Sequence, residues 1–170
     1  MNRLMHIAGT SLTFASLTFL TAAGCDKSGA PTWGTHPTPP AGATFLDADN
    51  SAEGVIAEVT SHRGEEAQRT AAAAYAGKWI AEPGWRGAIE KIHEGDGKTV
   101  FWMRYTTSAN PLTGSFYTAL EVPVNDRQPQ KAHEITFTGR IEEVRIITAG
   151  PAPEYQIIVK DGKVLTGGSK

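Results

Sequence analysis

The chain has 170 residues, of which 40% are hydrophobic and 20% are charged, and its formal net charge at pH 7 is −2. A nucleic-acid-binding domain normally carries a basic surplus, so this balance gives no sign of one, although it leaves room for a local basic patch. Cys25 is the only cysteine, which excludes a disulfide within the chain, so the folded part depends on its own core.

The first 25 residues have the layout of an export signal. The basic start Met1-Asn2-Arg3 is followed by residues 4–24, which contain no Asp, Glu, Lys or Arg, and the small residues Ala22-Ala23-Gly24 directly precede Cys25. Basic, apolar and small-residue regions in this order are typical of a secretory signal. With the cysteine directly behind them, they resemble a bacterial lipoprotein signal, in which the thiol is acylated and residues 1–24 are removed.

This resemblance implies a lipid-anchored protein outside the cytoplasm, in the bacterial cell envelope, whose partner is the membrane through lipid on Cys25. Two or three acyl chains hold a protein in a membrane, whereas a single chain binds marginally. A plainly secreted protein and an uncleaved anchor stay open as alternatives. Six Ser and Thr residues dilute the apolar stretch, which disfavours a permanent span, and Ala22 stands where lipoprotein signals usually have Leu.

Residues 25–46 and 47–76 differ in composition. The first segment is rich in Pro, Gly and Thr and shows no apolar period, which predicts a flexible tether. The second carries helix signals: Asn50 is expected to cap a helix, with Glu53 as its reciprocal partner. The helical period predicts a buried stripe formed by Ala52, Val55, Ile56 and Val59. A break near Gly64 precedes a second stripe, formed by Ala67, Ala71, Ala74 and Tyr75.

From residue 77 the apolar period changes from that of a helix to that of a strand. Residues 77–166 are expected to form one barrel, with a frayed tail at 167–170. Stretches rich in β-branched and aromatic residues predict five strands: 79–92, 99–105, 116–124, 134–147 and 155–165. The dipeptides Asp96-Gly97 and Asp161-Gly162 each predict a tight hairpin. Five strands without alternating helices favour a small antiparallel barrel, so the predicted fold class is mainly β (α+β).

Four segments, in this order, carry a resemblance to a known family: Tyr75-Ala76-Gly77-Lys78, Gly87-Ala88-Ile89-Glu90-Lys91-Ile92, Gly95-Asp96-Gly97-Lys98-Thr99-Val100 and Ile135-Thr136-Phe137-Thr138-Gly139-Arg140-Ile141-Glu142-Glu143-Val144. They resemble the anticodon-binding-like OB-fold family of small bacterial exported proteins, over residues 65–165. The resemblance implies a five-stranded OB-fold-type barrel preceded by a helix, and it implies little about function. The chain departs from the family by inserting Glu82-Pro83-Gly84-Trp85, where the first strand is expected to bulge or break.

Alternation along the strands assigns an inner and an outer face. The expected inward residues are Phe101, Met103, Tyr105, Phe116, Thr118, Leu120, Val122, Ile135, Phe137, Ile141, Tyr155, Ile157 and Val159, with Gly139 at a bend. The expected outward residues of the first three strands include Arg86, Ala88, Glu90, Trp102, Arg104, Tyr117, Ala119 and Glu121.

Four outward residues form the candidate ligand face: Arg86, Trp102, Arg104 and Tyr117. OB-folds bind oligonucleotides and oligosaccharides on this surface, and aromatic rings with arginines suit stacking on bases or sugars. The structural interpretation of these residues is the favoured one: Glu90 and Glu121 would pair with the two arginines across strands, and Trp102 would pack under the helical segment.

No catalytic constellation is visible in the sequence. Residues 114–117 lack the second glycine of a nucleophile elbow, and the histidines show no metal-ligand spacing. We therefore expect no enzyme activity, no metal and no cofactor. The favoured hypothesis is an exported, lipid-anchored OB-fold module that binds an envelope protein or glycan or gives structural support. The alternative is a domain at the cell surface that binds single-stranded nucleic acid.

Overall fold

The computed structural model of the protein describes residues 37–107, 114–123, 129–147 and 153–167. Two helices come first, α1 (Ala52–Ser61) and α2 (Glu65–Ala73). Five strands follow: β1 (Trp85–Gly95), β2 (Lys98–Thr106), β3 (Ser115–Pro123), β4 (Glu134–Ile147) and β5 (Glu154–Gly167).

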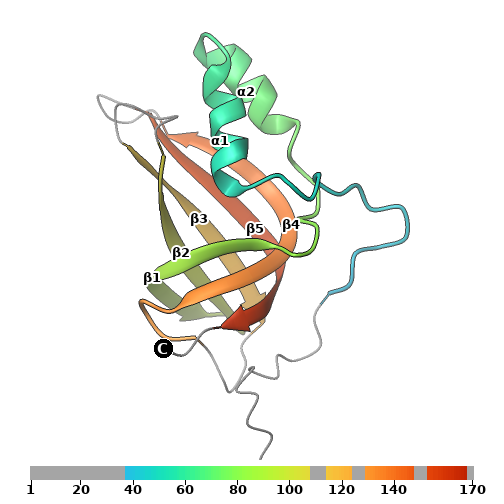
Figure 1. Ribbon diagram of the computed structural model, residues 1–170, viewed down its shortest axis with the longest axis vertical. Helices are drawn as coiled ribbons and strands as arrows, with labels where there is room; N and C mark the ends of the chain where they lie inside the picture. Colours follow the sequence, from blue (N-terminus) through green and yellow to red (C-terminus); the bar gives the residue numbers. More distant parts are fainter. Residues whose placement is uncertain (1–36, 108–113, 124–128, 148–152, 168–170) are drawn as a thin grey trace, which may run out of the picture.

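The strands close into a barrel in the order β1-β2-β3-β5-β4, with β4 pairing back onto β1 (Figure 1). β3 and β5 run parallel, and every other neighbouring pair of strands runs antiparallel. This mixed five-stranded ring is an OB-like barrel, which confirms the predicted fold class. The parallel pair is a correction to the purely antiparallel barrel that the strand pattern favoured, because strand order along the chain does not reveal which distant strands meet.

The two Asp-Gly dipeptides have different roles. Asp96 and Gly97 join β1 to β2 with φ angles of 52° and 72°, which confirms the first predicted hairpin. Asp161 and Gly162 lie inside β5, so the second hairpin prediction is wrong. They form an irregularity in the pairing of β5 with β4, opposite Gly139.

Gly139 is buried where β4 lies close against β5. A Cβ at this position would lie 2.5 Å from Cγ1 of Val159 and 2.9 Å from the carbonyl oxygen of Lys160. No side chain fits there without movement of the neighbouring strand, which agrees with the predicted bend at this glycine.

The core follows the predicted alternation. Every residue assigned inward in β2 to β5 is buried, from Phe101 to Val159. Ala119 is a correction: it was expected outward and exposed, but only 5% of its surface is accessible. Its small side chain is flanked by Trp102 on β2 and Ile158 on β5, its partners in the sheet, and these larger groups shield it from solvent.

The first predicted strand begins later than expected. β1 starts at Trp85, directly after Gly84, which has a φ of 89° and lies against the backbone of Phe137. The inserted residues therefore break the strand, as predicted. Upstream, the backbone N–H of Trp79 donates to the carbonyl of Thr44, and the N–H of Leu46 donates to the carbonyl of Trp79, both at 2.8 Å.

The helices cover one end of the barrel (Figure 1). α1 buries the predicted stripe of Ala52, Val55, Ile56 and Val59. Its cap is Ser51, whose Oγ accepts a hydrogen bond from the N–H of Gly54 at 3.0 Å, so the prediction of Asn50 was one residue early. The carbonyl of Asn50 instead accepts a hydrogen bond from the indole N–H of Trp85 at 2.8 Å, which ties the start of α1 to β1.

The second helix begins directly after Gly64, the residue of the predicted break, which has a φ of 90° and occupies the N-cap position. α2 buries Ala72, and Tyr75 is buried just beyond its end. Ala74, which was expected on the same face, is exposed. The helix ends at Ala73, so the helical period used to place Ala74 no longer applies there.

Candidate ligand-binding site

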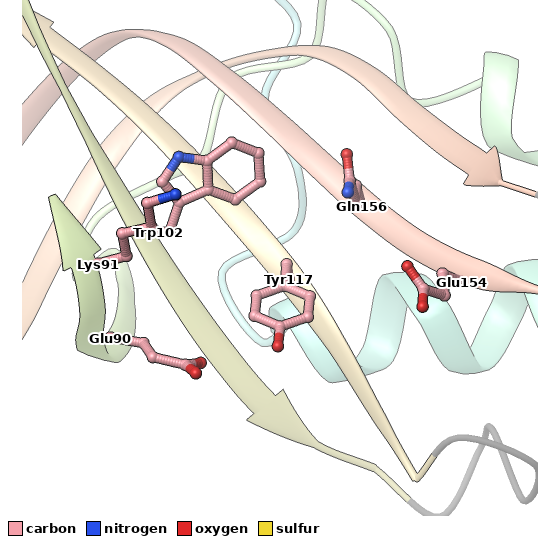
Figure 2. A pocket seen from close by; sticks show the side chains of 6 residues that line it. All are labelled: Glu90, Lys91, Trp102, Tyr117, Glu154 and Gln156. Atoms are coloured by element: carbon pink, nitrogen blue, oxygen red, sulfur yellow. The ribbon is translucent and has the colours of Figure 1, made fainter. Parts of the chain in front are cut away.

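An open hollow of about 310 Å³ lies on the outer surface of the barrel. Its lining comes from four strands and consists of Glu90, Lys91, Trp102, Tyr117, Glu154 and Gln156 (Figure 2). No residue of either helix lines it. On the side that faces the hollow, Trp102 is therefore accompanied by strand residues alone.

Strand register brings the two aromatic rings of the hollow together. Trp102 on β2 pairs with Ala119 on β3, and Tyr117 stands two residues before Ala119 on the same face. Cross-strand neighbours in this diagonal relation are within reach of long aromatic side chains. Tyr117 in turn pairs with Gln156 of the parallel strand β5, which adds an amide to the site. Trp102 and Tyr117 are both half-buried.

A β-bulge places two charged side chains beside Trp102. Ile89 pairs with Met103 and Lys91 pairs with Trp102, so Glu90 is one residue too many on β1. Ile89 is buried, whereas Glu90 and Lys91 are both exposed and both line the hollow. Bulges of this kind redirect side chains and occur preferentially next to functional sites.

The polar groups of the hollow lack partners within the part of the chain that the structure describes. Glu90, Lys91 and Glu154 form no ion pair there, while six other carboxylates do: Glu65, Glu121, Glu134, Glu142, Glu143 and Asp161. The ring–ring contacts found among the described residues join Trp85 to Phe137 and Tyr105 to Phe116. Neither Trp102 nor Tyr117 takes part in them, so neither ring is paired with another aromatic ring of the described residues.

Two of the four predicted site residues meet and two do not. Trp102 and Tyr117 lie together in the hollow. Arg86 pairs with Glu134 across the β1–β4 junction at 3.2 Å, and both side chains are largely exposed. Arg104 is exposed and its guanidinium donates to Oγ of Ser115 at 3.4 Å. Whether the four-residue face binds anything stays a prediction, but the hollow itself lacks both arginines.

The observed cross-strand ion pairs also differ from the expected ones. Glu121 pairs with Lys98 at 2.6 Å, and not with an arginine. Glu90 has no ion-pair partner among the residues described. The prediction missed Lys91, Glu154 and Gln156 as members of the site. Two neighbouring residues were available signals of the bulge, because strict alternation would turn the charged Lys91 inward and the apolar Ile92 outward. In the structure Ile92 instead packs against the core.

A second polar cluster spans β4 and β5 and has a structural role. The guanidinium of Arg140 lies 2.8 Å from Glu142 and 3.1 Å from Asp161. Hydrogen bonds from Lys160 and Arg140 lower the pKa of Glu142, and the hydrogen bond to Asp161 raises the pKa of Arg140. These contacts hold the irregular segment of β5 against β4. The charges of this cluster are therefore neutralised by ion pairs within the protein.

Two further features, a metal site and a membrane-spanning helix, concern the same described residues. Within them no group of three or more His, Cys, Asp or Glu side chains could hold a metal ion. No helix in this part of the chain is long and apolar enough to cross a membrane. Cys25, the signal at residues 1–24 and the first part of the tether lie outside the described residues, so export and acylation stay predictions, as do the segment boundaries.

Comparisons with known proteins add little. No family model and no curated protein matches the chain, so the family resemblance stays a prediction. A solved structure, aspartyl tRNA synthetase from Entamoeba histolytica, is similar to 82% of this chain at 11% sequence identity and a TM-score of 0.35. The chain spans 29% of the length of that enzyme. Because the TM-score is so low, the likeness carries no argument about this protein.

Proposed function

We propose that this protein is an exported, lipid-anchored binding module of the bacterial cell envelope, and that its OB-like barrel holds an envelope component in the outer hollow. The export and anchoring parts rest on the pattern that ends at Cys25. The binding part rests on one observation: the half-buried rings of Trp102 and Tyr117 stand in the hollow without an aromatic partner among the described residues. Aromatic groups that converge with a few polar groups in a hollow are typical of binding sites.

An envelope component suits this hollow better than a nucleic acid does. The carboxylates of Glu90 and Glu154 stand in its lining and would repel phosphate groups, and Lys91 is its one cation. Nucleic-acid sites instead depend on basic side chains that neutralise phosphates. Arg86 and Arg104, which favoured the nucleic-acid alternative, lie outside the hollow.

The test is co-sedimentation of the full chain with purified cell-wall material and, separately, with envelope membranes. The chain carries Cys25→Ser, so that no acyl group can mediate the interaction. We expect co-sedimentation with one of these fractions, and we expect Trp102→Ala to weaken it about tenfold, the loss typical of removing a stacking side chain. Arg104→Ala, which changes a neighbouring outward residue outside the hollow, is the matched control and should bind like the wild type.

Two results would contradict the proposal. One is the absence of co-sedimentation with every envelope fraction. The other is binding that Trp102→Ala leaves intact, which would move the site away from the hollow. Salt-sensitive binding of a single-stranded oligonucleotide, lost in Trp102→Ala, would support the nucleic-acid alternative in place of the envelope component.

A further inference from the structure

The charges of the hollow narrow the class of ligand that it accepts; this step rests on the proposed function of the same site. Figure 2 shows Glu90 and Glu154 on opposite sides of Tyr117, with Trp102 and Lys91 beside each other at the β1 side. Two carboxylates against one ammonium group give the hollow a formal charge of −1, and none of the three is neutralised by an ion pair with a described residue.

The aromatic rings of the hollow also favour a positively charged ligand. The face of an aromatic ring carries negative electrostatic potential, and a cation placed over Trp or Tyr is attracted to it. The cation–π contact found among the described residues, Lys78 over Tyr75, lies elsewhere in the molecule. Trp102 and Tyr117 take no part in that contact, so neither ring is engaged by a cation of the described residues. Proteins bind quaternary ammonium groups against aromatic rings, and nearby carboxylates add Coulombic attraction for the cation.

The bulge adds a site for a negative group. Without it, Lys91 and Glu90 would point to opposite faces of β1; with it, both stand at the edge of the hollow. The Lys91 ammonium can therefore meet an anionic group of a ligand whose cation lies between the carboxylates. A ligand with both groups would place an opposite charge beside each of the three charged side chains of the hollow.

We infer that the hollow binds the alkylammonium group of a small zwitterion, with the cation against Trp102 and Tyr117, between Glu90 and Glu154, and the anionic group of the ligand at Lys91. The volume of about 310 Å³ is at the lower end of the range for small-molecule sites. It suits one head group and not an extended chain. The head group can belong to a free metabolite or to a lipid, and these two sources share the same chemistry.

The test compares phosphocholine with 3,3-dimethylbutyl phosphate, by calorimetric titration into the full chain carrying Cys25→Ser. The two probes have the same shape and the same phosphate, but carbon replaces the quaternary nitrogen in the second, so their difference isolates the positive charge. We expect phosphocholine to bind about tenfold more tightly, in line with a desolvated cation–π contact. Phosphoethanolamine, with a primary ammonium group, extends the comparison to the second common head group.

Substitutions of the lining residues identify which side chains contact the ligand. Trp102→Ala should abolish measurable binding of phosphocholine, and Trp102→Phe should retain part of it, which distinguishes loss of a ring from loss of the fold. Glu90→Gln and Glu154→Gln, which keep the size of each side chain, should each weaken phosphocholine severalfold. Neither variant should weaken the isostere, because it has no cation to lose and its phosphate is repelled by both carboxylates. Glu94→Gln makes the same change at an exposed position of β1 outside the hollow, so it is the matched control and should have no effect on either probe.

Binding to lipid vesicles distinguishes the two sources of the head group, a lipid and a free metabolite. Sedimentation with phosphatidylcholine vesicles, competed by free phosphocholine, would place the head group in a lipid; binding of free phosphocholine without vesicle binding would place it in a soluble ligand. Equal affinity for phosphocholine and its isostere would overturn the inference, because the site would then recognise shape and phosphate alone. Absence of binding by phosphocholine and phosphoethanolamine would also overturn it. If an envelope fraction still bound through Trp102 in that case, the proposed function would stand without this inference.

Discussion

Tyr105 and Thr118 carry the two buried side-chain hydroxyl groups that have no hydrogen-bond partner within the described part of the chain. The ring of Tyr105 stacks on Phe116 with centroids 4.9 Å apart, so Tyr105 stabilises the barrel through its ring. Its hydroxyl is buried and forms no hydrogen bond of normal geometry, although the Thr118 hydroxyl is near enough to lower its pKa. Burial of a polar group with such weak compensation is unfavourable. At this position the polar atom therefore opposes the stability that the ring provides.

Tyr105→Phe should consequently leave the free energy of unfolding unchanged or raise it by up to about 1 kcal/mol. Urea unfolding measures the change. Tyr155→Phe is the contrasting variant, because the Tyr155 hydroxyl donates to Oε1 of Gln68 at 3.1 Å and links β5 to α2. That variant should lose about 1 kcal/mol. A larger loss for Tyr105→Phe than for Tyr155→Phe would contradict this account.

The same phenols predict loss of stability at alkaline pH. Burial raises the pKa of Tyr105, and the charge of Glu53 adds to the shift; burial and then the hydrogen bond to Glu58 raise the pKa of Tyr75. A raised pKa in the folded state means that the unfolded chain releases the proton first, at the ordinary phenol pKa of 10.0. The stabilising contribution is therefore complete below pH 10 and declines as the pH rises above it.

Urea unfolding at a series of pH values from 8 upward tests this expectation. Each buried phenol should contribute a slope of up to about 1.4 kcal/mol per pH unit above pH 10. Tyr105→Phe should make the decline shallower, since one titrating group is removed. A decline that begins near neutral pH, or one that Tyr105→Phe leaves unaltered, would show that other groups control alkaline stability.

At the scale of elements, the bulge in β1 allows the two charges beside Trp102 to be separated. Deleting Glu90 makes Ile89 and Lys91 consecutive, which restores regular alternation with Ile89 inward and Lys91 outward. Deleting Lys91 gives the same backbone with Glu90 outward. The two deletions therefore form a matched pair that differs in the sign of one charge at the hollow.

Both deletions should fold, with the free energy of unfolding within about 1 kcal/mol of the wild type, because no core residue changes face. Deletion of Glu90 should weaken binding of an alkylammonium probe, whereas deletion of Lys91 should weaken binding of its anionic group. Urea unfolding and calorimetric titration report the two effects. Unfolding of both variants would show that the bulge is needed for barrel closure, and equal binding would contradict the assigned charges.

The elements could be predicted from the sequence wherever alternation is regular. β4 has the bounds expected from its pattern, 134–147, because apolar and polar residues alternate there around the small Gly139. Asp161-Gly162 was misread because a turn dipeptide inside a strand looks the same locally as one between strands; the difference lies in the pairing with β4. The cap at Ser51 was missed by one residue because both Asn and Ser are good caps.

The site was predictable in part for similar reasons. Trp102 and Tyr117 were found because they are outward aromatic residues on two strands joined in sequence. Glu154 and Gln156 were missed because they reach the hollow through the parallel pairing of β3 with β5, and nothing local in the sequence sets that register. Glu90 and Lys91 stand side by side only because of the bulge, which strict alternation does not reveal.

For the whole molecule, the proposed anchor at Cys25 makes a prediction that is independent of the hollow. With acyl chains on the cysteine, the wild type should be recovered in the membrane fraction, since two or more chains hold a protein firmly at a bilayer. Cys25→Ser should move the protein to the soluble fraction with its fold unchanged. Fractionation, and mass spectrometry of the mature N-terminus, measure both effects; an unmodified N-terminus in wild-type protein would contradict anchoring.

The central claim is that the outer hollow of this OB-like barrel is the binding site, and the indole N–H signals in a ¹H–¹⁵N spectrum test it most directly. The chain has four tryptophans, and Trp85 is an internal reference because its indole N–H is already bonded to the carbonyl of Asn50. During titration with phosphocholine or soluble cell-wall fragments, we predict a saturable shift of the Trp102 signal, assigned through Trp102→Phe, while the Trp85 signal stays in place. Binding of either ligand without movement of the Trp102 signal would contradict the account.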